Sequence, residues 1–358
     1  MRPYDAFLLL SFGGPEKRED VIPFLENVTR GRNIPRERLA EVGEHYYLFG
    51  GVSPINQQCR DLIAALRTRF EAESAEPLLR LPIYWGNRNW QPYIEDTVAR
   101  MAKDGVRRVI ALATSAFSSY SSHRQYLEDI DRARRAYGPE APEIDLIRPY
   151  FDHPGFIDSF VDTTRTALAE LPPDLRTQAR LLYSAHSIPV TMAQLSGDPA
   201  IDYGSEGAYV AQLSEVARLV TERLAAAQGY ELPYELVYQS RSGPPSQPWL
   251  EPDINDRLRE LAAEGVTAVV VVPHGFVSDH MEVKFDLDVE ASQTARDLGI
   301  AMTRARCPGT HPAFVAMVGE LVAERTRGDP PAGLSRHTSR VHVCPPDCCR
   351  KNQPQAAT

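Results

Sequence analysis

The chain has 358 residues, of which 43% are apolar and 24% charged, and its formal net charge is −9. This length exceeds what one hydrophobic core usually organises, so two domains are expected. The acidic balance, without a long Lys/Arg block, excludes an ordinary nucleic-acid-binding surface, and no apolar run is long enough to cross a bilayer. The start, MRPYDAFLLLSFGG, indicates a first strand and a turn instead of a signal peptide, so we expect a cytoplasmic protein.

Short apolar, β-branched runs alternate along the chain with stretches of helical periodicity. Strands of this kind, separated by helices, are typical of parallel α/β sheets. Eight strands are predicted, at residues 5–12, 79–85, 107–114, 143–149, 179–185, 234–240, 266–273 and 300–305. Helices are predicted at residues 55–72, 91–104, 154–170, 206–228, 252–264 and 311–327.

The strands fall into two sets of four, so the predicted fold is two doubly wound, Rossmann-like α/β domains. We place the N-terminal domain at residues 1–160, the C-terminal domain at 161–327 and a Cys-rich tail at 328–358. No GxGxxG loop follows the first strand and no P-loop occurs, which argues against nucleotide chemistry. A ligand site in such a pair is expected at the carboxyl ends of the strands, in a cleft between the domains.

One histidine stands where such a site would form. His186, in the stretch YSAHSIP, directly follows the fifth predicted strand. Because an unperturbed imidazole titrates near pH 6.5, it can be neutral in the cell and accept a proton or bind a metal. The alternative is a histidine that only caps the strand end through hydrogen bonds.

A second candidate segment, VPHGFVSDHMEVKFDLDVEAS at residues 272–292, follows the seventh predicted strand and continues into a helix. Glu282, Asp286 and Glu290 recur every four residues, which predicts an acidic ridge along one helix face. Like charges at this spacing destabilise a helix, so a function is indicated, although a solvated charged face is the alternative. Both segments follow strands of one sheet, so the ridge and His186 should share an edge.

With these residues in place, the chain resembles the ferrochelatase family. LLYSAHSIPVTMAQLSGDP (181–199) is similar to the family signature, and the segment around Glu282 is similar to its second active-site segment. HYYLFGGVSPIN and YWGNRNWQPYIEDTV resemble its N-terminal half. The resemblance covers roughly residues 4–327, and the N-terminal details look most like the coproporphyrin ferrochelatases of actinobacteria.

The resemblance implies a lyase of heme biosynthesis that inserts Fe(II) into a porphyrin, expected to be coproporphyrin III, to give coproheme. It assigns catalysis to His186, Glu282, Asp286 and Glu290, with His186 and Glu282 also touching the Fe(II) substrate. It assigns porphyrin binding to Phe12, Arg30, Tyr46, Ser53 and Arg88. Phe12, Thr29 and His45 depart from the family pattern, which affects the contacts expected with iron and with the propionates. The partners implied are the porphyrin, ferrous iron and a downstream coproheme decarboxylase.

The five cysteines are unevenly placed, and their clustering in a protein of the cytosol points to a metal more than to disulfides. Some members of the family carry a [2Fe–2S] cluster, so the resemblance implies four thiolate ligands, from Cys307, Cys344, Cys348 and Cys349. A structural zinc site is the rival. Cys59, inside the helix predicted at 55–72, is expected to be a buried apolar residue.

Three other functions stay open from the sequence. The first is insertion of iron into protoporphyrin IX. The second is a chelatase for another metal and tetrapyrrole, such as cobalt and sirohydrochlorin, for which His280 is the candidate second histidine. The third is a haem carrier without turnover, against which the acidic ridge argues because a carrier removes no protons.

Overall fold

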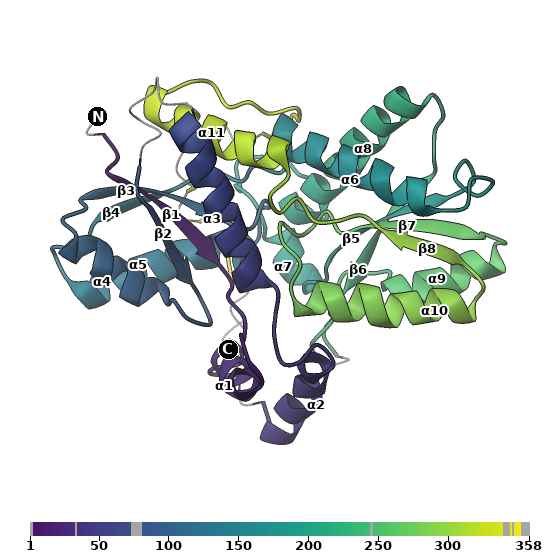
Figure 1. The fold of residues 1–358 in the computed structure, drawn as a ribbon, viewed down its shortest axis with the longest axis horizontal. Coiled ribbons are helices and arrows are strands. Elements are labelled where there is room, and N and C mark those ends of the chain that lie inside the picture. Colours follow the sequence, from purple (N-terminus) through teal and green to yellow (C-terminus); the bar gives the residue numbers. More distant parts are fainter. Residues whose placement is uncertain are drawn as a thin grey trace.

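Two parallel four-stranded sheets form the frame of the molecule, and each belongs to one lobe (Figure 1). The computed structural model describes residues 3–32, 34–72, 81–243, 246–338, 344–345 and 347–351. The first sheet, ordered β2-β1-β3-β4, contains β1 (Ala6–Ser11), β2 (Ile83–Asn87), β3 (Arg108–Ala113) and β4 (Glu143–Leu146). The second, ordered β6-β5-β7-β8, contains β5 (Arg180–His186), β6 (Tyr234–Gln239), β7 (Ala268–Val272) and β8 (Ala301–Arg304). The two orders repeat one winding pattern, which confirms the predicted pair of doubly wound sheets.

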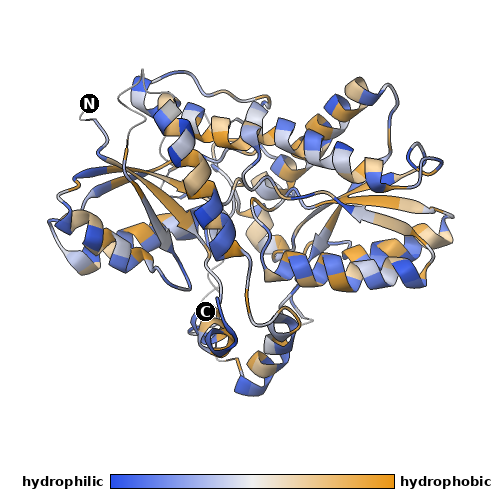
Figure 2. Cartoon of the chain, in the orientation of Figure 1, coloured by the Kyte–Doolittle hydropathy of each residue, from blue (hydrophilic) through white to orange (hydrophobic). Residues whose placement is uncertain are grey.

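Helices cover both faces of each sheet, and alternate residues of the central strands face opposite sides. Phe7 and Leu9 of β1 pack in the same core as helix α3 (Ile55–Ala72), whereas Leu8 and Leu10 pack with α4 (Ile94–Lys103) and α5 (Gln125–Tyr137). All six residues of β1 are therefore buried, and Figure 2 shows the apolar strands enclosed by helices with polar outer faces.

The second sheet is covered in the same way. Its helices are α6 (Pro154–Glu170), α7 (Val190–Gln194), α8 (Gly207–Gln228), α9 (Ile254–Ala263) and α10 (Ser292–Asp297). The last helix, α11 (Pro312–Arg327), packs on α6 and also on α3 of the first lobe. Leu181 and Tyr183 of β5 face the core that contains α8, and Leu182 faces the core that contains α9. Helix α6 runs without a break through residue 160 and packs on β7 and β8, so the whole helix belongs with the second sheet.

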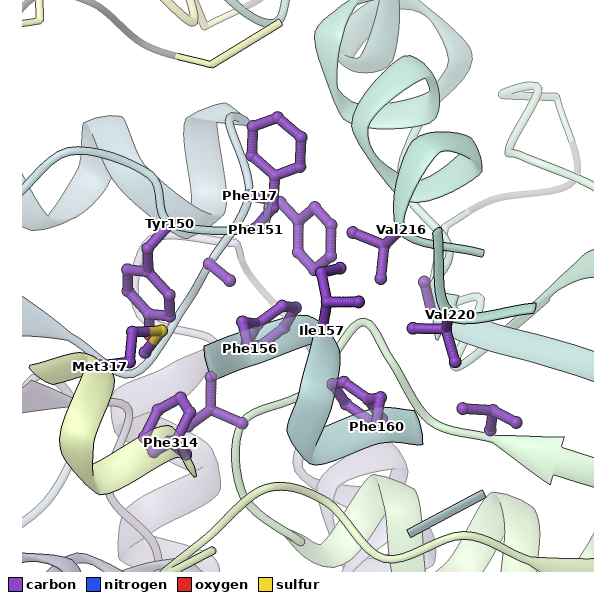
Figure 3. Packing of buried hydrophobic residues seen from close by; sticks show 14 of the residues in the cluster. Phe117, Tyr150, Phe151, Phe156, Ile157, Phe160, Val216, Val220, Phe314 and Met317 are labelled. Carbon is purple, nitrogen blue, oxygen red and sulfur yellow. The ribbon is translucent and has the colours of Figure 1, made fainter. Parts of the chain in front are cut away.

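One apolar core joins the two lobes. Phe156 of α6 lies at its centre, with ring centroids 6.1 Å from Phe117, 5.9 Å from Tyr150 and 6.4 Å from Phe314 (Figure 3). These rings come from the loops after β3 and β4, from α6 and from α11. Burying a phenylalanine contributes about 1.5–3 kcal/mol, so this seam fixes the lobes against each other.

Two further helices, α1 (Val21–Val28) and α2 (Arg36–Tyr47), project below the sheets in Figure 1 and were not predicted. The short 3₁₀ turn at Arg18–Asp20 leads into α1. Met281, from the second lobe, packs against their apolar side chains. The pair therefore touches the segment that carries Glu282.

The described part of the tail is tied to the folded lobes by hydrogen bonds. The buried Asp152 accepts hydrogen bonds from the Ser335 N–H at 3.1 Å and from the Thr338 hydroxyl. Arg148 binds Glu324 through two bonds of 3.0 Å and also reaches the carbonyl of Ala332. This part of the tail does not depend on the cysteines for its docking.

The predicted elements are confirmed with small shifts at their ends. The strand predicted at 79–85 is β2, which begins at Ile83, and residues 79–80 lie outside the described residues. The strand predicted at 143–149 is β4, which ends at Leu146. Arg148 therefore lies beyond the end of the strand, and its side chain is buried. No described helix is long and apolar enough to cross a membrane.

Candidate active site

His186 is the last residue of β5, at the strand end where the sequence predicted it, and hydrogen bonds hold both its ring and its backbone. Its Nδ1 lies 2.5 Å from the carbonyl oxygen of Ser187, so Nδ1 carries a proton and Nε2 faces outward. The Tyr209 hydroxyl donates to the carbonyl of His186 at 3.0 Å, which fixes the backbone. One third of the His186 side chain remains exposed, so a substrate can reach it.

Glu282 lies opposite His186. Its Oε2 is 3.6 Å from Nε2 of His186 and 3.8 Å from Nδ1 of His280. Burial would lower the pKa of His186, but the Glu282 carboxylate outweighs burial and the net pKa is raised. Burial alone would raise the pKa of Glu282, but the His186 charge lowers it to about 2. Each group therefore favours the charged form of the other, an imidazolium facing a carboxylate.

His280 stays neutral beside this pair. Burial lowers the pKa of His280, and the positive charge of His186 lowers it further against the opposing effect of Glu282. The site thus places two imidazoles around a single carboxylate, with the charged form favoured at His186 and the neutral form at His280.

The acidic ridge lies on a π-helix, Val283–Ala291, which begins one residue after Glu282. A π-helix is wider than an α-helix and occurs mostly as single turns at functional sites, so nine residues in this form are unusual. Because each turn takes more than four residues, Glu282, Asp286 and Glu290 follow one another along one face. Burial, with the carboxylates of Glu282 and Glu290 assisting, raises the pKa of Asp286 to about 7.

Two residues at the end of β6 hold the ridge and were missed from the sequence. The Gln239 side chain donates to the Glu282 carbonyl at 3.3 Å and to Asp286 at 3.4 Å, and Ser184 positions it from β5 at 2.6 Å. The Ser240 hydroxyl donates to Asp286 from a backbone with φ 63°, a left-handed conformation that is rare outside glycine. Polar residues directly after a strand of the same sheet were the available signal.

Helix α2 brings an aromatic group to the site. Tyr46 is buried, and its pKa is raised first by burial and then by the charges of Glu282 and Asp286. The ring of His45 stacks on Phe285 of the π-helix with centroids 3.7 Å apart. The structure therefore brings Tyr46 together with the predicted catalytic residues.

The other predicted porphyrin-binding residues differ in placement. Phe12 is 38% exposed and contacts Phe24, while Arg30 is exposed after α1 and donates to Asn27. Ser53 is buried and packs against Gly14, where an added Cβ would come within 2.6 Å of it.

Arg88 is mostly engaged within the first lobe. Its side chain is 8% exposed, forms a 2.6 Å ion pair with Asp129 and lies over the Tyr126 ring at 4.0 Å. These contacts stabilise the first lobe, while its Nη2 has no hydrogen-bond partner among the described residues, and its role in porphyrin binding stays a prediction.

The predicted cysteine set is divided. Cys348 and Cys349 have their Sγ atoms 3.4 Å apart, and Cys344 contacts Cys348. Cys307 lies elsewhere, buried in the core of the second lobe near Asp279 and Arg304. Within the described ranges, no three His, Cys, Asp or Glu side chains surround one point as metal ligands do. Cys59 is buried in α3, as predicted.

Two hollows of about 360 Å³ each lie away from His186 and Glu282. One is lined by Tyr203 and His337, and the other by Arg134 and Pro139. The candidate active site is therefore identified by the side chains that converge around His186 and Glu282, and neither hollow is part of it.

The sequence of the chain matches the ferrochelatase family model over residues 4–326. This chain belongs to the ferrochelatase family. A coproporphyrin III ferrochelatase of Streptomyces coelicolor is 52% identical, with 99% of this chain and 96% of the relative covered. A second, from Nocardia farcinica, is 52% identical, with coverage of 99% and 98%. A ferrochelatase of Rhodopirellula baltica is 50% identical, with coverage of 97% and 93%.

Membership places the chain among lyases and leaves the carrier hypothesis without support. Among solved structures, SirB from Bacillus subtilis with Fe³⁺ has a TM-score of 0.50 and 14% identity, and the superposition covers 92% of this chain and 99% of SirB. That likeness shows a shared fold.

The pKa of Asp286 predicts a pH dependence. Below pH 7 this carboxyl is protonated and cannot accept a proton, so kcat/KM for metal insertion should rise as the pH passes through about 7. Glu290→Gln removes a charge that raises this pKa, so the rise should move to lower pH. Ser240→Ala removes a hydrogen bond that lowers it, so the rise should move to higher pH. Equal pH profiles in all three proteins would exclude Asp286 as the titrating group.

Proposed function

We propose that this chain inserts Fe(II) into coproporphyrin III to give coproheme, as a step of heme biosynthesis. The observation that carries the proposal is the His186–Glu282 pair, 3.6 Å apart, at the end of β5. It is supported by about half identity, over nearly the whole chain, to coproporphyrin III ferrochelatases. We propose Fe(II) and the porphyrin as its substrates.

Insertion of Fe(II) requires two pyrrole protons to leave and water to be stripped from the metal. Glu282, ionised and half exposed, is the anionic oxygen ligand available to an incoming ferrous ion. The dication would disfavour the positive charge on His186, because like charges lower the pKa of an imidazole. His186 would then give up its proton, and its neutral Nε2 could accept one from a pyrrole.

The acidic ridge supplies a route for the protons. Asp286, with a pKa of about 7, can both take up and release a proton near neutrality, whereas Glu282 is too acidic for this task. Gln239 donates hydrogen bonds to the Glu282 carbonyl and to the Asp286 carboxylate, and so fixes the position of one relative to the other. Glu290, whose pKa burial raises, lies one turn farther along toward solvent.

Helices α1 and α2 are proposed to receive the porphyrin. Phe12, Phe24 and Trp90 form an edge-to-face aromatic series, with centroids 6.2 and 6.3 Å apart, beside Tyr46. Among the described residues, Arg30 and Arg32 form no ion pair with a carboxylate, while Arg38 is paired with Glu41 at 2.6 Å. Unpaired guanidinium groups suit the propionates, of which coproporphyrin III has four.

We also propose that the tail holds a [2Fe–2S] cluster, with structural zinc as the rival. The neighbouring thiols of Cys344, Cys348 and Cys349 support it. Cys307 does not fit the fourth position, because its surroundings are Asp279, Arg304 and the core of the second lobe. A cytoplasmic location and delivery of coproheme to a decarboxylase stay predictions.

His186→Ala should reduce kcat below about a tenth of the wild-type value, a loss above about 1.4 kcal/mol of transition-state stabilisation. Glu282→Gln should cost about a hundredfold or more, since it removes the metal-binding charge, and Asp286→Asn should cost less because it lies one turn away. Porphyrin binding, followed by absorbance, should be retained in all three. A larger loss in Asp286→Asn than in Glu282→Gln would contradict the proposed order of roles.

The proposed substrate is tested by offering both porphyrins in one anaerobic Fe(II) assay. Coproporphyrin III should give a higher kcat/KM than protoporphyrin IX. Arg30→Ala should raise KM more for coproporphyrin III than for protoporphyrin IX. Arg38→Ala, which removes an already paired guanidinium, is the matched control and should leave the ratio unchanged. A wild-type preference for protoporphyrin IX would defeat the proposal.

A further inference from the structure

Three tail thiols lie where loops of the two lobes meet. Cys349 contacts Gly197, which follows β5 and α7 in the second lobe, and Cys344 contacts His123, which follows β3 in the first. The Sγ atoms of Cys348 and Cys349 are 3.4 Å apart. Two thiolates about 2.3 Å from one tetrahedral metal ion stand about 3.8 Å apart, whereas a disulfide requires about 2.05 Å. The spacing is close to that of two ligands on one metal ion.

The backbone at Cys349 is strained in a way that favours this arrangement. Its φ is 53° and it is fully buried, and the left-handed conformation costs a non-glycine residue roughly 1–2 kcal/mol. Two hydrogen bonds hold it: the Cys349 N–H donates to the Gly197 carbonyl at 3.1 Å, and the Gly197 N–H donates to Sγ at 3.2 Å. Such strain is typical of ligand clamps, and N–H groups bonded to ligating sulfurs tune iron–sulfur clusters.

A histidine completes the group. His123 is 4% exposed and lies in the five-residue π-helical segment Tyr120–Arg124, a widening of the same kind as that at Val283–Ala291. Its imidazole hydrogen-bonds the Cys344 thiol, which also hydrogen-bonds Cys348. A continuous series of contacts therefore runs from His123 through Cys344 and Cys348 to Cys349.

We infer that His123, and not Cys307, is the fourth ligand of the tail cluster, beside Cys344, Cys348 and Cys349. This inference rests on the proposed [2Fe–2S] cluster. Imidazole is an established ligand of such clusters, and it raises their reduction potential because it is neutral. Ligation requires the four side chains to turn toward a common centre, and the three thiols lose their protons in the process.

The surrounding charges suit an anionic centre. Arg124 follows His123 in the π-helical segment, and its positive charge acts on Cys344. Lys351, two residues after Cys349, lies over the ring of Tyr120 with its Nζ 5.6 Å from the centroid. Both cations belong to the two segments that carry the proposed ligands.

The test compares the full-length protein, purified anaerobically, with His123→Ala, His123→Cys and Cys307→Ser. His337→Ala is the matched control, because His337 is also buried, belongs to the tail and packs against Tyr203. Iron and acid-labile sulfide are counted per chain. The dithionite-reduced protein is examined by pulsed EPR with ¹⁴N- and ¹⁵N-labelled histidine.

Wild type, Cys307→Ser and His337→Ala should each hold two irons and two sulfides and show one histidine nitrogen coupled to the cluster. His123→Ala should hold less than a tenth of that iron. His123→Cys should retain the cluster without the nitrogen coupling and with a lower reduction potential.

Loss of the cluster in Cys307→Ser with full retention in His123→Ala would overturn the inference, and so would a wild-type cluster without nitrogen coupling. Colourless protein with zinc, or with no metal, would overturn the inference and the proposed cluster together. Chelatase activity, assayed on the same samples, reports separately on the proposed function, because that activity depends on His186 and Glu282.

Discussion

His186 and Glu282 each stabilise the charged form of the other in a partly buried site, and the chemistry proposed for the chain depends on this pair. Burial opposes both charges, and each charge is favoured by the opposite charge of the other group, 3.6 Å away. That distance joins the end of β5 to the start of the π-helix, two segments almost one hundred residues apart in the chain. The surrounding structure holds these two segments at this distance.

Several contacts carry that task. Tyr209 of α8 fixes the backbone of His186, and its own N–H donates to the hydroxyl of Ser196 at 2.8 Å. The next residue, Gly197, binds Cys349 of the tail. The histidine is thus connected, through one helix and one loop, to the proposed cluster. On the other side, Met281 packs against α1 and α2, so the segment before Glu282 is positioned by the same helices that would receive a porphyrin.

The sequence predicted the elements whose signal is local. The strands have apolar runs, and α6 appears with the predicted bounds, since each needs only its own periodicity. Helix α2 was missed because most of its residues are polar, and only Leu39, Gly43 and Tyr46 are buried. Arg88 and Cys307 were assigned by resemblance, but their partners Asp129 and Asp279 are distant in sequence. For the same reason no sequence pattern joined His123 to the tail cysteines, or Ser240 to Asp286.

The most direct test of the central pair is an NMR titration of the protein labelled with ¹⁵N-histidine, with the His186 signal assigned by its absence in His186→Ala. The account predicts that the pKa of His186 in the wild type lies above the ordinary histidine value of 6.5, and that Glu282→Gln lowers it, because burial then acts without the opposing carboxylate. An unchanged pKa of His186 in Glu282→Gln would contradict the claim that each group stabilises the charged form of the other.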